Sequence, residues 1–311
     1  MTLRMNLIMG YKHTKYPEWS WSQSRENIFK TCLRKYYFQY YKSHNGWEWN
    51  APEENKKVYR LKKLQSTDTI LGSSVHHLLH RVIYDGLPLE KKVLDDKIKK
   101  ELNDAFRESQ NKPAWKVNPS KHVMLKEIYY NDELKDSKID FINYKKDQII
   151  NYLINTDVVE NIKNSYYVKS FDTDTFETFE YNKTKVYAIP DLIYKKGKNE
   201  KPHIVDWKTG KEKNSSKEQL KLYAYYYYRT YNYTGEITAT FIYLYEQKKK
   251  EYIFDDKIIK ETEKKIENSI KEMKEYLKDE KWNQPLGQAQ FKKRTNDVVC
   301  SYCKFRELCN R

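Results

Sequence analysis

The sequence predicts one α/β domain in which a central mixed β-sheet is flanked by helices. Short segments rich in β-branched and aromatic residues gather between residues 165 and 255 and are bounded by Asn, Lys, Gly or Pro, as strands are. Segments with apolar residues at every third or fourth position precede, interrupt and follow them, as amphipathic helices do. A chain of 311 residues suits one elaborated domain, 1–311, better than two independent ones.

The composition is that of a folded protein with a polyanionic partner. Hydrophobic residues make up 39% of the chain and include 29 tyrosines and 11 phenylalanines, which supply enough area for a core. A formal net charge of +15 favours nucleic acid as the partner, with an anionic membrane surface second. The same charge also fits a merely solvated surface, so function has to be argued from a site.

The chain carries no recognisable targeting or membrane segment. The first ten residues are too short for a signal-peptide core, and no stretch approaches the roughly 20 apolar residues of a membrane span. We therefore expect a soluble, cytoplasmic protein. In such a reducing compartment, four cysteines are more consistent with metal ligation than with disulfides.

The N-terminal part is expected to form two helices joined by a polar connector. The first helix lies within residues 18–45, begins at serines suited to capping, and carries Cys32 in its middle. Residues 43–69 fit the connector. The second helix opens at Gly72 and places His76 in its first turns.

The remaining elements follow in order along the chain. Residues 70–164 contain this histidine-bearing helix and a charged helical insertion without recognisable chemistry. The strands of residues 165–255 enclose the segment KEQLKLYAYYYYRTY, which fits a helix crossing between two strands. One more amphipathic helix is expected at 256–281, and the basic segment 290–311 ends the chain.

A candidate site lies on two segments of the predicted sheet. Asp206 and Lys208 stand two residues apart in IVDWKTG, so on a strand they face one side while Trp207 faces the other. Asp191 joins them if its strand is a neighbour. Two carboxylates would bind Mg²⁺ or Mn²⁺, and a lysine beside the ion could orient water and offset charge in phosphodiester hydrolysis. The alternative is a surface ion pair that leads into a turn.

Four ordered motifs resemble the RecB-like branch of the PD-(D/E)XK nuclease superfamily. They are Gly72-Ser-Ser-Val-His76, Ile189-Pro190-Asp191, Val205-Asp206-Trp207-Lys208-Thr209-Gly210 and Gln219-Leu-Lys-Leu-Tyr223. The resemblance covers both ends of the chain and about residues 165–230, and leaves the insertion at 89–164 unmatched.

The resemblance implies a restriction-endonuclease-like core and assigns roles to these residues. The catalytic residues would be Asp191, Asp206 and Lys208. The Mg²⁺ or Mn²⁺ ligands would be His76, both aspartates and the backbone carbonyl of Trp207. Gln219 and Tyr223 would lie along the DNA, and their spacing places them on one face of a helix.

The cysteines resemble those of the iron-sulfur members of this branch, the AddB-type helicase-nucleases and CRISPR-associated exonucleases. Cys32 precedes the histidine motif, and Cys300, Cys303 and Cys309 follow the core, with Leu33 where proline is common. The resemblance implies a structural [4Fe-4S] cluster that clasps the two ends of the chain. Zinc fits four thiolates as well.

Four further residues could join these sites but have simpler interpretations. His77 and His80 are expected on the helix surface, because only His76 matches the motif. Glu177 and Glu180 precede Asp191 by one strand and are expected in solvent.

The sequence therefore predicts a metal-dependent DNA nuclease, in particular a single-stranded DNA exonuclease of repair, recombination or a related process. No phosphate-binding loop of an ATP motor is found, so a helicase would be a separate partner. One alternative is a catalytically silent DNA-binding scaffold subunit of a helicase-nuclease complex. Another is a zinc-bound nucleic-acid adaptor without an active site.

Overall fold

A five-stranded mixed β-sheet forms the centre of the protein. The structure is a computed structural model and describes residues 14–131, 136–171, 178–212 and 217–310. The sheet has the order β2-β5-β6-β7-β8, with β6 parallel to β7 and the other neighbours antiparallel. Its strands are β2 (Tyr167–Ser170), β5 (Leu192–Lys195), β6 (His203–Lys208), β7 (Ile237–Tyr243) and β8 (Lys248–Phe254). The predicted mixed sheet at 165–255 is confirmed.

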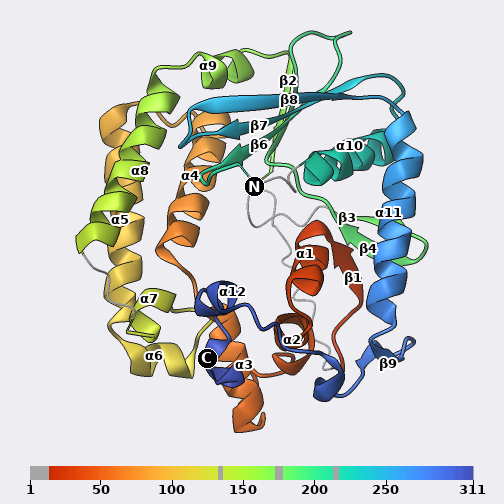
Figure 1. The fold of residues 1–311 in the computed structure, drawn as a ribbon. Helices are drawn as coiled ribbons and strands as arrows, with labels where there is room; N and C mark the ends of the chain where they lie inside the picture. The colour runs from red at the N-terminus through yellow and green to blue at the C-terminus, as the bar shows by residue number, and fades with distance from the viewer. Residues whose placement is uncertain (1–13, 132–135, 172–177, 213–216, 311) are drawn as a thin grey trace, which may run out of the picture.

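Helices cover both faces of this sheet (Figure 1). On one face lie α10 (Lys217–Tyr231) and α11 (Lys257–Lys274), and α10 is the predicted crossover between the parallel strands β6 and β7. The other face is covered by helices of the N-terminal half and the insertion: α4 (Thr67–Tyr84), α5 (Lys91–Ser109), α8 (Asp136–Ile154) and α9 (Val158–Lys163). The short α6 (Lys112–Val117) and α7 (Lys126–Tyr129) complete the insertion.

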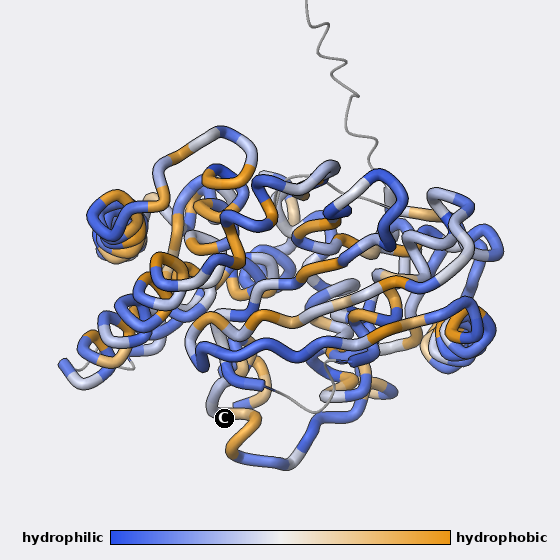
Figure 2. Tube along the Cα trace, turned by 90° about the horizontal axis from the view of Figure 1, so that it is seen from above, coloured by the Kyte–Doolittle hydropathy of each residue, from blue (hydrophilic) through white to orange (hydrophobic). Residues whose placement is uncertain are grey.

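Burial follows the alternation of the strands. Ile204 packs on the α10 side of the sheet, whereas Val205 and Trp207 pack on the α4 side. Figure 2 shows a hydrophilic strand at the sheet edge beside more hydrophobic ones, and β8 is that edge strand, with its lysines exposed. Charges on an edge strand discourage pairing with another chain. In the part of the chain that the structure describes, no helix is long and apolar enough to span a membrane.

The predicted helix within 18–45 is wrong in one respect, because it is broken at Cys32. α1 (Gln23–Thr31) is capped by Ser22 as expected, α2 (Leu33–Tyr37) follows, and a π-helical turn (Phe38–Lys42) ends the segment. Cys32 has an extended backbone, with φ −164° and ψ 114°. The N–H of Arg34 donates to the carbonyl of Lys292, at 3.2 Å. A contact with the far end of the chain thus replaces a bond within the helix.

Two other boundaries differ from the prediction. The expected connector at 43–69 contains α3 (Glu53–Lys63), whose few apolar residues, among them Val58 and Leu61, are buried within a charged sequence. The helix that carries His76 begins at Thr67, capped by Ser66, rather than at Gly72.

Small strands outside the main sheet were not predicted. β1 (Ser20–Ser22) pairs in parallel with β4 (Thr184–Tyr187), which pairs with β3 (Thr178–Tyr181). The helix expected at 256–281 ends at Lys274, and β9 (Leu277–Asp279) pairs with β10 (Gln284–Pro285). The segment 290–311 contains α12 (Asp297–Ser301) and a short 3-10 turn (Arg306–Cys309).

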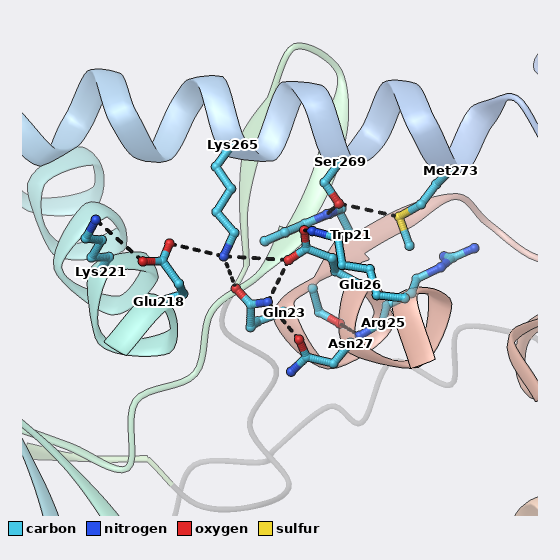
Figure 3. A network of polar contacts seen from close by, with 12 residues as sticks. Trp21, Gln23, Arg25, Glu26, Asn27, Glu218, Lys221, Lys265, Ser269 and Met273 are labelled. Carbon is cyan, nitrogen blue, oxygen red and sulfur yellow. Dashed lines mark hydrogen bonds and ion pairs between the residues drawn. The ribbon is translucent and has the colours of Figure 1, made fainter. Parts of the chain in front are cut away.

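A polar network holds α1 against α10 and α11 (Figure 3). Glu26 on α1 is 1% exposed and lies 3.6 Å from Lys265 on α11, which also pairs with Glu218 on α10 at 3.3 Å. Trp21 donates to the hydroxyl of Ser269 at 2.9 Å. The segment before Cys32 is thereby fixed to the helices that cover the sheet.

Candidate active site

The two predicted aspartates meet where β5 begins and β6 ends. Asp191 directly precedes β5, and β5 pairs antiparallel with β6, so Leu192 faces Val205. One carboxylate oxygen of Asp191, Oδ2, accepts a hydrogen bond of 2.7 Å from the backbone N–H of Trp207. The sequence predicted that Asp191 would join Asp206 if their strands were neighbours. The strands do pair, and this hydrogen bond accounts for the fixed position of Asp191.

Asp206 is a buried carboxylate with an unsatisfied oxygen. The residue is 2% exposed, and Lys208 Nζ lies 2.5 Å from its Oδ2. That contact lacks hydrogen-bond geometry, and no other described residue donates to this oxygen. Burial, and then the negative charge of Asp191, raises the pKa of Asp206 to about 6. A cation between the two aspartates would relieve both causes.

His76 reaches the same point from α4. Its Nδ1 lies 3.1 Å from Oδ1 of Asp191. Burial lowers the pKa of His76, but the charge and hydrogen bond of Asp191 outweigh burial, so the pKa is raised. One turn earlier, a Cβ on Gly72 would meet Oγ1 of Thr209 at 3.3 Å. Glycine thus lets α4 approach the end of β6 closely.

The carboxylate and imidazole groups suit a hard divalent cation, but the carboxylate of Asp191 is hydrogen-bonded within the protein. Asp191 has both oxygens engaged, one by His76 and one by the N–H of Trp207. Within the described ranges, no group of three or more His, Cys, Asp or Glu side chains stands ready to hold a metal ion. Two carboxylates and an imidazole nonetheless converge from three elements, and the buried Oδ2 of Asp206 is paired with the amine of Lys208. The residues fit Mg²⁺ or Mn²⁺ once His76 releases Asp191.

A chain of hydrogen bonds positions Lys208. Its Nζ donates to Oε1 of Gln219 at 3.0 Å, and Nε2 of Gln219 donates to the hydroxyl of Tyr223 at 2.7 Å. Burial, followed by the charges of Asp206 and Asp191, raises the pKa of Tyr223 well above its usual value, so the phenol stays protonated. Both predicted α10 residues therefore contact the candidate site.

Phe241 was missed by the sequence analysis. It lies on β7 opposite Asp206, and the amine of Lys208 stands 5.2 Å from its ring centre. The ring is buried and forms an apolar surface next to the lysine amine. Only knowledge that β6 and β7 pair in this register would have identified it.

The other candidate ligands lie elsewhere or outside the described residues. His77 is exposed, and His80 stacks on Tyr84 with 5.5 Å between ring centres. Glu180 is exposed on β3, in the second sheet, and Glu177 lies outside the described residues.

The segments that carry the four cysteines lie side by side. Arg34 Nε donates to the carbonyl of Phe291 at 2.8 Å, and Arg294 Nη1 donates to the carbonyl of Thr31 at 3.0 Å. All four thiols are described and none forms a disulfide; they are Cys32, Cys300, Cys303 and Cys309. The segment around Cys32 therefore contacts residues 291–294.

The thiols are close enough to influence one another. Burial raises the pKa of Cys303, and Cys32 and Cys300 add to that effect. Burial also raises the pKa of Cys309, with smaller contributions from Cys303 and Cys32. As they stand, however, no three of these thiols form a metal-holding group. The structure brings the four cysteines together without a ready ligand geometry.

Comparison with known proteins identifies a family for the chain. The family model for the PD-(D/E)XK nuclease superfamily matches residues 20–310. No curated protein matches the chain. Among solved structures, the crystal structure of SSO0001 aligns at 13% identity with a TM-score of 0.26, over 59% of this chain and 91% of the other.

Proposed function

Because the chain belongs to the PD-(D/E)XK nuclease superfamily, we propose that it is a Mg²⁺- or Mn²⁺-dependent exonuclease of single-stranded DNA. The observation that carries this proposal is the convergence of Asp191, Asp206 and Lys208 at the adjoining ends of β5 and β6. The superfamily implies a nuclease, which is a phosphodiester hydrolase.

The residues of the site divide into ligands and positioning groups. Asp191, Asp206, His76 and the carbonyl of Trp207 would hold the ion, which supplies a Lewis acid for the phosphate and lowers the pKa of bound water. Lys208 lies 2.5 Å from Asp206 and can offset charge on the phosphate in the transition state.

Gln219 and Tyr223 keep Lys208 in place. The amide of Gln219 accepts from the amine of Lys208 and donates to the phenol of Tyr223. The raised pKa keeps that phenol protonated, and a hydrogen bond to Asp206 is one of its causes, so Tyr223 also links Gln219 to the buried aspartate.

A single-stranded substrate is supported by the face of α10 that leads away from the site. Gln219, Tyr223, Tyr227 and Tyr231 recur at every fourth position and so share one face. The rings of Tyr227 and Tyr231 lie 4.6 Å apart, and Lys169 Nζ donates to the hydroxyl of Tyr231 at 3.4 Å. Tyr223 and Tyr227 are buried, whereas Tyr231 is 40% exposed beside Lys169. The exposed ring of Tyr231 can therefore stack an unpaired base while the lysine holds its phosphate.

We further propose that Cys32, Cys300, Cys303 and Cys309 hold a structural [4Fe-4S] cluster, with zinc as the alternative. The contacts between Thr31, Arg34 and the segment 291–294 support a clasp of both chain ends.

The cellular role would be repair, recombination or a related DNA process in the cytoplasm, with a separate helicase as a possible partner subunit. A silent DNA-binding scaffold is the alternative, in which the same residues would bind DNA without cutting it.

The decisive experiment compares the wild-type protein, Asp206→Ala and Lys208→Ala, purified without oxygen. Linear single-stranded, circular single-stranded and duplex DNA are incubated with Mn²⁺, with labels at either end of the linear strand. Shortening of linear single strands alone, reduced at least about 100-fold in both variants, is expected. Tight DNA binding without cleavage by the wild type would favour the scaffold. Brown colour with about four irons per chain would support the cluster.

A further inference from the structure

A hollow on the helical half of the protein combines indole rings with positive charge. The cavity has a volume of about 500 Å³. It lies between the turn at 46–49, α3 and the residues around the end of α6, and its lining includes Trp47, Trp49, Lys56, Tyr59, Arg60 and Lys116. We call it the tryptophan hollow.

The aromatic wall of the tryptophan hollow is exposed yet held in place. Trp49 is 89% exposed and Trp47 is 41% exposed. A Cβ on Gly46 would come within 2.4 Å of the carbonyl oxygen of Asn55, so the turn is seated tightly against α3. Trp47 packs edge-on against Tyr59, with 5.5 Å between ring centres. Indoles presented to water on a fixed turn are typical of a binding surface.

The polar lining is cationic. Lys56, Arg60 and Lys116 line the hollow together with a single carboxylate, Glu48. Lys56 Nζ donates to the backbone carbonyl of Trp49 at 2.6 Å, which places a positive charge on the turn that carries the exposed indole. Arg60 pairs with Glu53 at 2.6 Å, whereas Lys116 has no ion pair within the described ranges. An anionic ligand with a flat apolar group would match both features.

We propose that the tryptophan hollow binds a base of single-stranded DNA at a second position, outside the catalytic site. The base would stack on Trp49, and the adjacent phosphates would lie against Lys56 and Lys116. A paired base could not present its face to the indole, so the hollow selects single strands. The choice of DNA over another single-stranded polyanion rests on the proposed nuclease function.

A second DNA-binding position should contribute to the affinity for DNA without taking part in the cleavage step. In Figure 1, α3 and α6 lie at the end of the protein away from β6 and β7. A strand that reaches both the hollow and the catalytic residues is held at two points, so long strands should bind more tightly than short ones. Removal of the hollow should raise KM for long strands and leave kcat unchanged.

The chain offers a matched control for the exposed tryptophan. Trp282 is 63% exposed and has Lys281 Nζ 5.3 Å from its ring centre, but it lies in the β9–β10 turn and not in the hollow. Trp49→Ala and Lys116→Ala are therefore compared with Trp282→Ala and Lys281→Ala. Trp49→Phe, which keeps a ring for stacking, serves as a rescue variant.

Binding is measured by fluorescence anisotropy with labelled thymidine oligonucleotides in EDTA, on the Asp206→Ala background, so that cleavage plays no part. Trp49→Ala should weaken binding of a strand of about 20 nucleotides by about 5- to 100-fold, and Trp49→Phe should restore most of it. Lys116→Ala should reduce the salt dependence of the logarithm of affinity by about 0.7. The affinity of each control variant for the same strand should stay within about twofold of that of the Asp206→Ala parent.

The proposal is overturned if Trp49→Ala binds the long strand as the Trp282→Ala control does, or if it weakens duplex binding equally. Circular dichroism of each variant shows that a binding loss is not a folding loss, and Trp49→Phe keeps the test valid if Trp49→Ala unfolds. Cleavage is assayed separately with the wild-type catalytic residues. If no protein cleaves DNA, the proposed nuclease function fails while the binding comparison still decides the hollow.

Discussion

His76 Nδ1 lies 3.1 Å from Oδ1 of Asp191, so the histidine occupies the carboxylate that a metal ion would need. The other oxygen of Asp191 is taken by the N–H of Trp207. Metal binding therefore competes with a hydrogen bond and should be accompanied by a small rotation of His76. The same imidazole would become a ligand after that rotation.

Removal of His76 should weaken metal binding more than catalysis. In His76→Ala, the Mn²⁺ concentration for half-maximal cleavage should rise by about tenfold or more, because one ligand is lost. At saturating Mn²⁺ much of kcat should return, whereas Asp206→Ala should stay inactive. His77→Ala changes an exposed neighbour and serves as the control. An unchanged Mn²⁺ requirement in His76→Ala would exclude a ligand role.

In the metal-free protein, Asp206 should lower the free energy of unfolding at neutral pH. Its pKa is raised to about 6 in the folded state from 3.8, so the folded state binds more protons than the unfolded state between these values. Stability therefore falls as pH rises from about 4 to about 6 and is flat above. Asp206→Asn should raise the unfolding free energy in EDTA at pH 7.5 by about 3 kcal/mol while abolishing cleavage.

Asp68→Asn tests the direction of this stability change, because the pKa of Asp68 is shifted the opposite way. Burial raises the pKa of Asp68, but hydrogen bonds and charge from Lys145 and Lys138 outweigh it, so its pKa is lowered. That carboxylate stabilises the fold above its unfolded pKa, so its replacement should lower Tm at pH 7.5. Urea unfolding of both variants at pH 4.5 and pH 7.5 measures the effect. A loss of stability in Asp206→Asn at pH 7.5 would contradict the argument.

The candidate site was predictable where it depends on local periodicity. Asp206 and Lys208 face one side of β6 and Trp207 the other, because side chains alternate along any strand. Gln219 and Tyr223 share a face of α10 for the equivalent helical reason. Four motifs that follow one another in the family's order also marked the site.

Features that depend on distant contacts were not predictable. The break at Cys32 accompanies a hydrogen bond from Arg34 to Lys292, which lies more than 250 positions away in the chain. β1 is only three residues long and exists through parallel pairing with β4. Neither element has a periodicity of its own, so no local pattern could reveal it.

Gln219 should act by positioning Lys208. Gln219→Ala removes the acceptor at 3.0 Å from Nζ, and the lysine is then free to adopt other rotamers. We expect kcat to fall by about tenfold with little change in KM or in Tm. Gln247→Ala removes an exposed glutamine near Gln148 and should leave both constants unchanged. A change in KM alone would instead indicate that Gln219 only contacts DNA.

Cys303 should hold the C-terminal segment in place through the proposed cluster. In Cys303→Ser we expect loss of the brown colour and faster tryptic cleavage after Lys293 or Arg294, which are exposed. Ser301→Ala, in the same segment, should keep both the colour and the protease resistance of the wild type. A colourless Cys303→Ser protein with unchanged resistance would mean that the cluster does not act as a clasp.

Gly72 should set the distance between α4 and the end of β6. In Gly72→Ala the new Cβ would lie 3.3 Å from Thr209 Oγ1, so α4 must shift by a few tenths of an ångström, carrying His76 with it. Alanine favours the helix by up to about 1 kcal/mol over glycine, so Tm should not fall. The expected result is a kcat reduced about three- to tenfold at full stability, a loss of about 1 kcal/mol in transition-state binding. Adding Thr209→Ala removes the opposing oxygen and should restore kcat, because the shift is no longer required. A double variant as slow as Gly72→Ala alone would show that the spacing between these two residues does not control the position of His76.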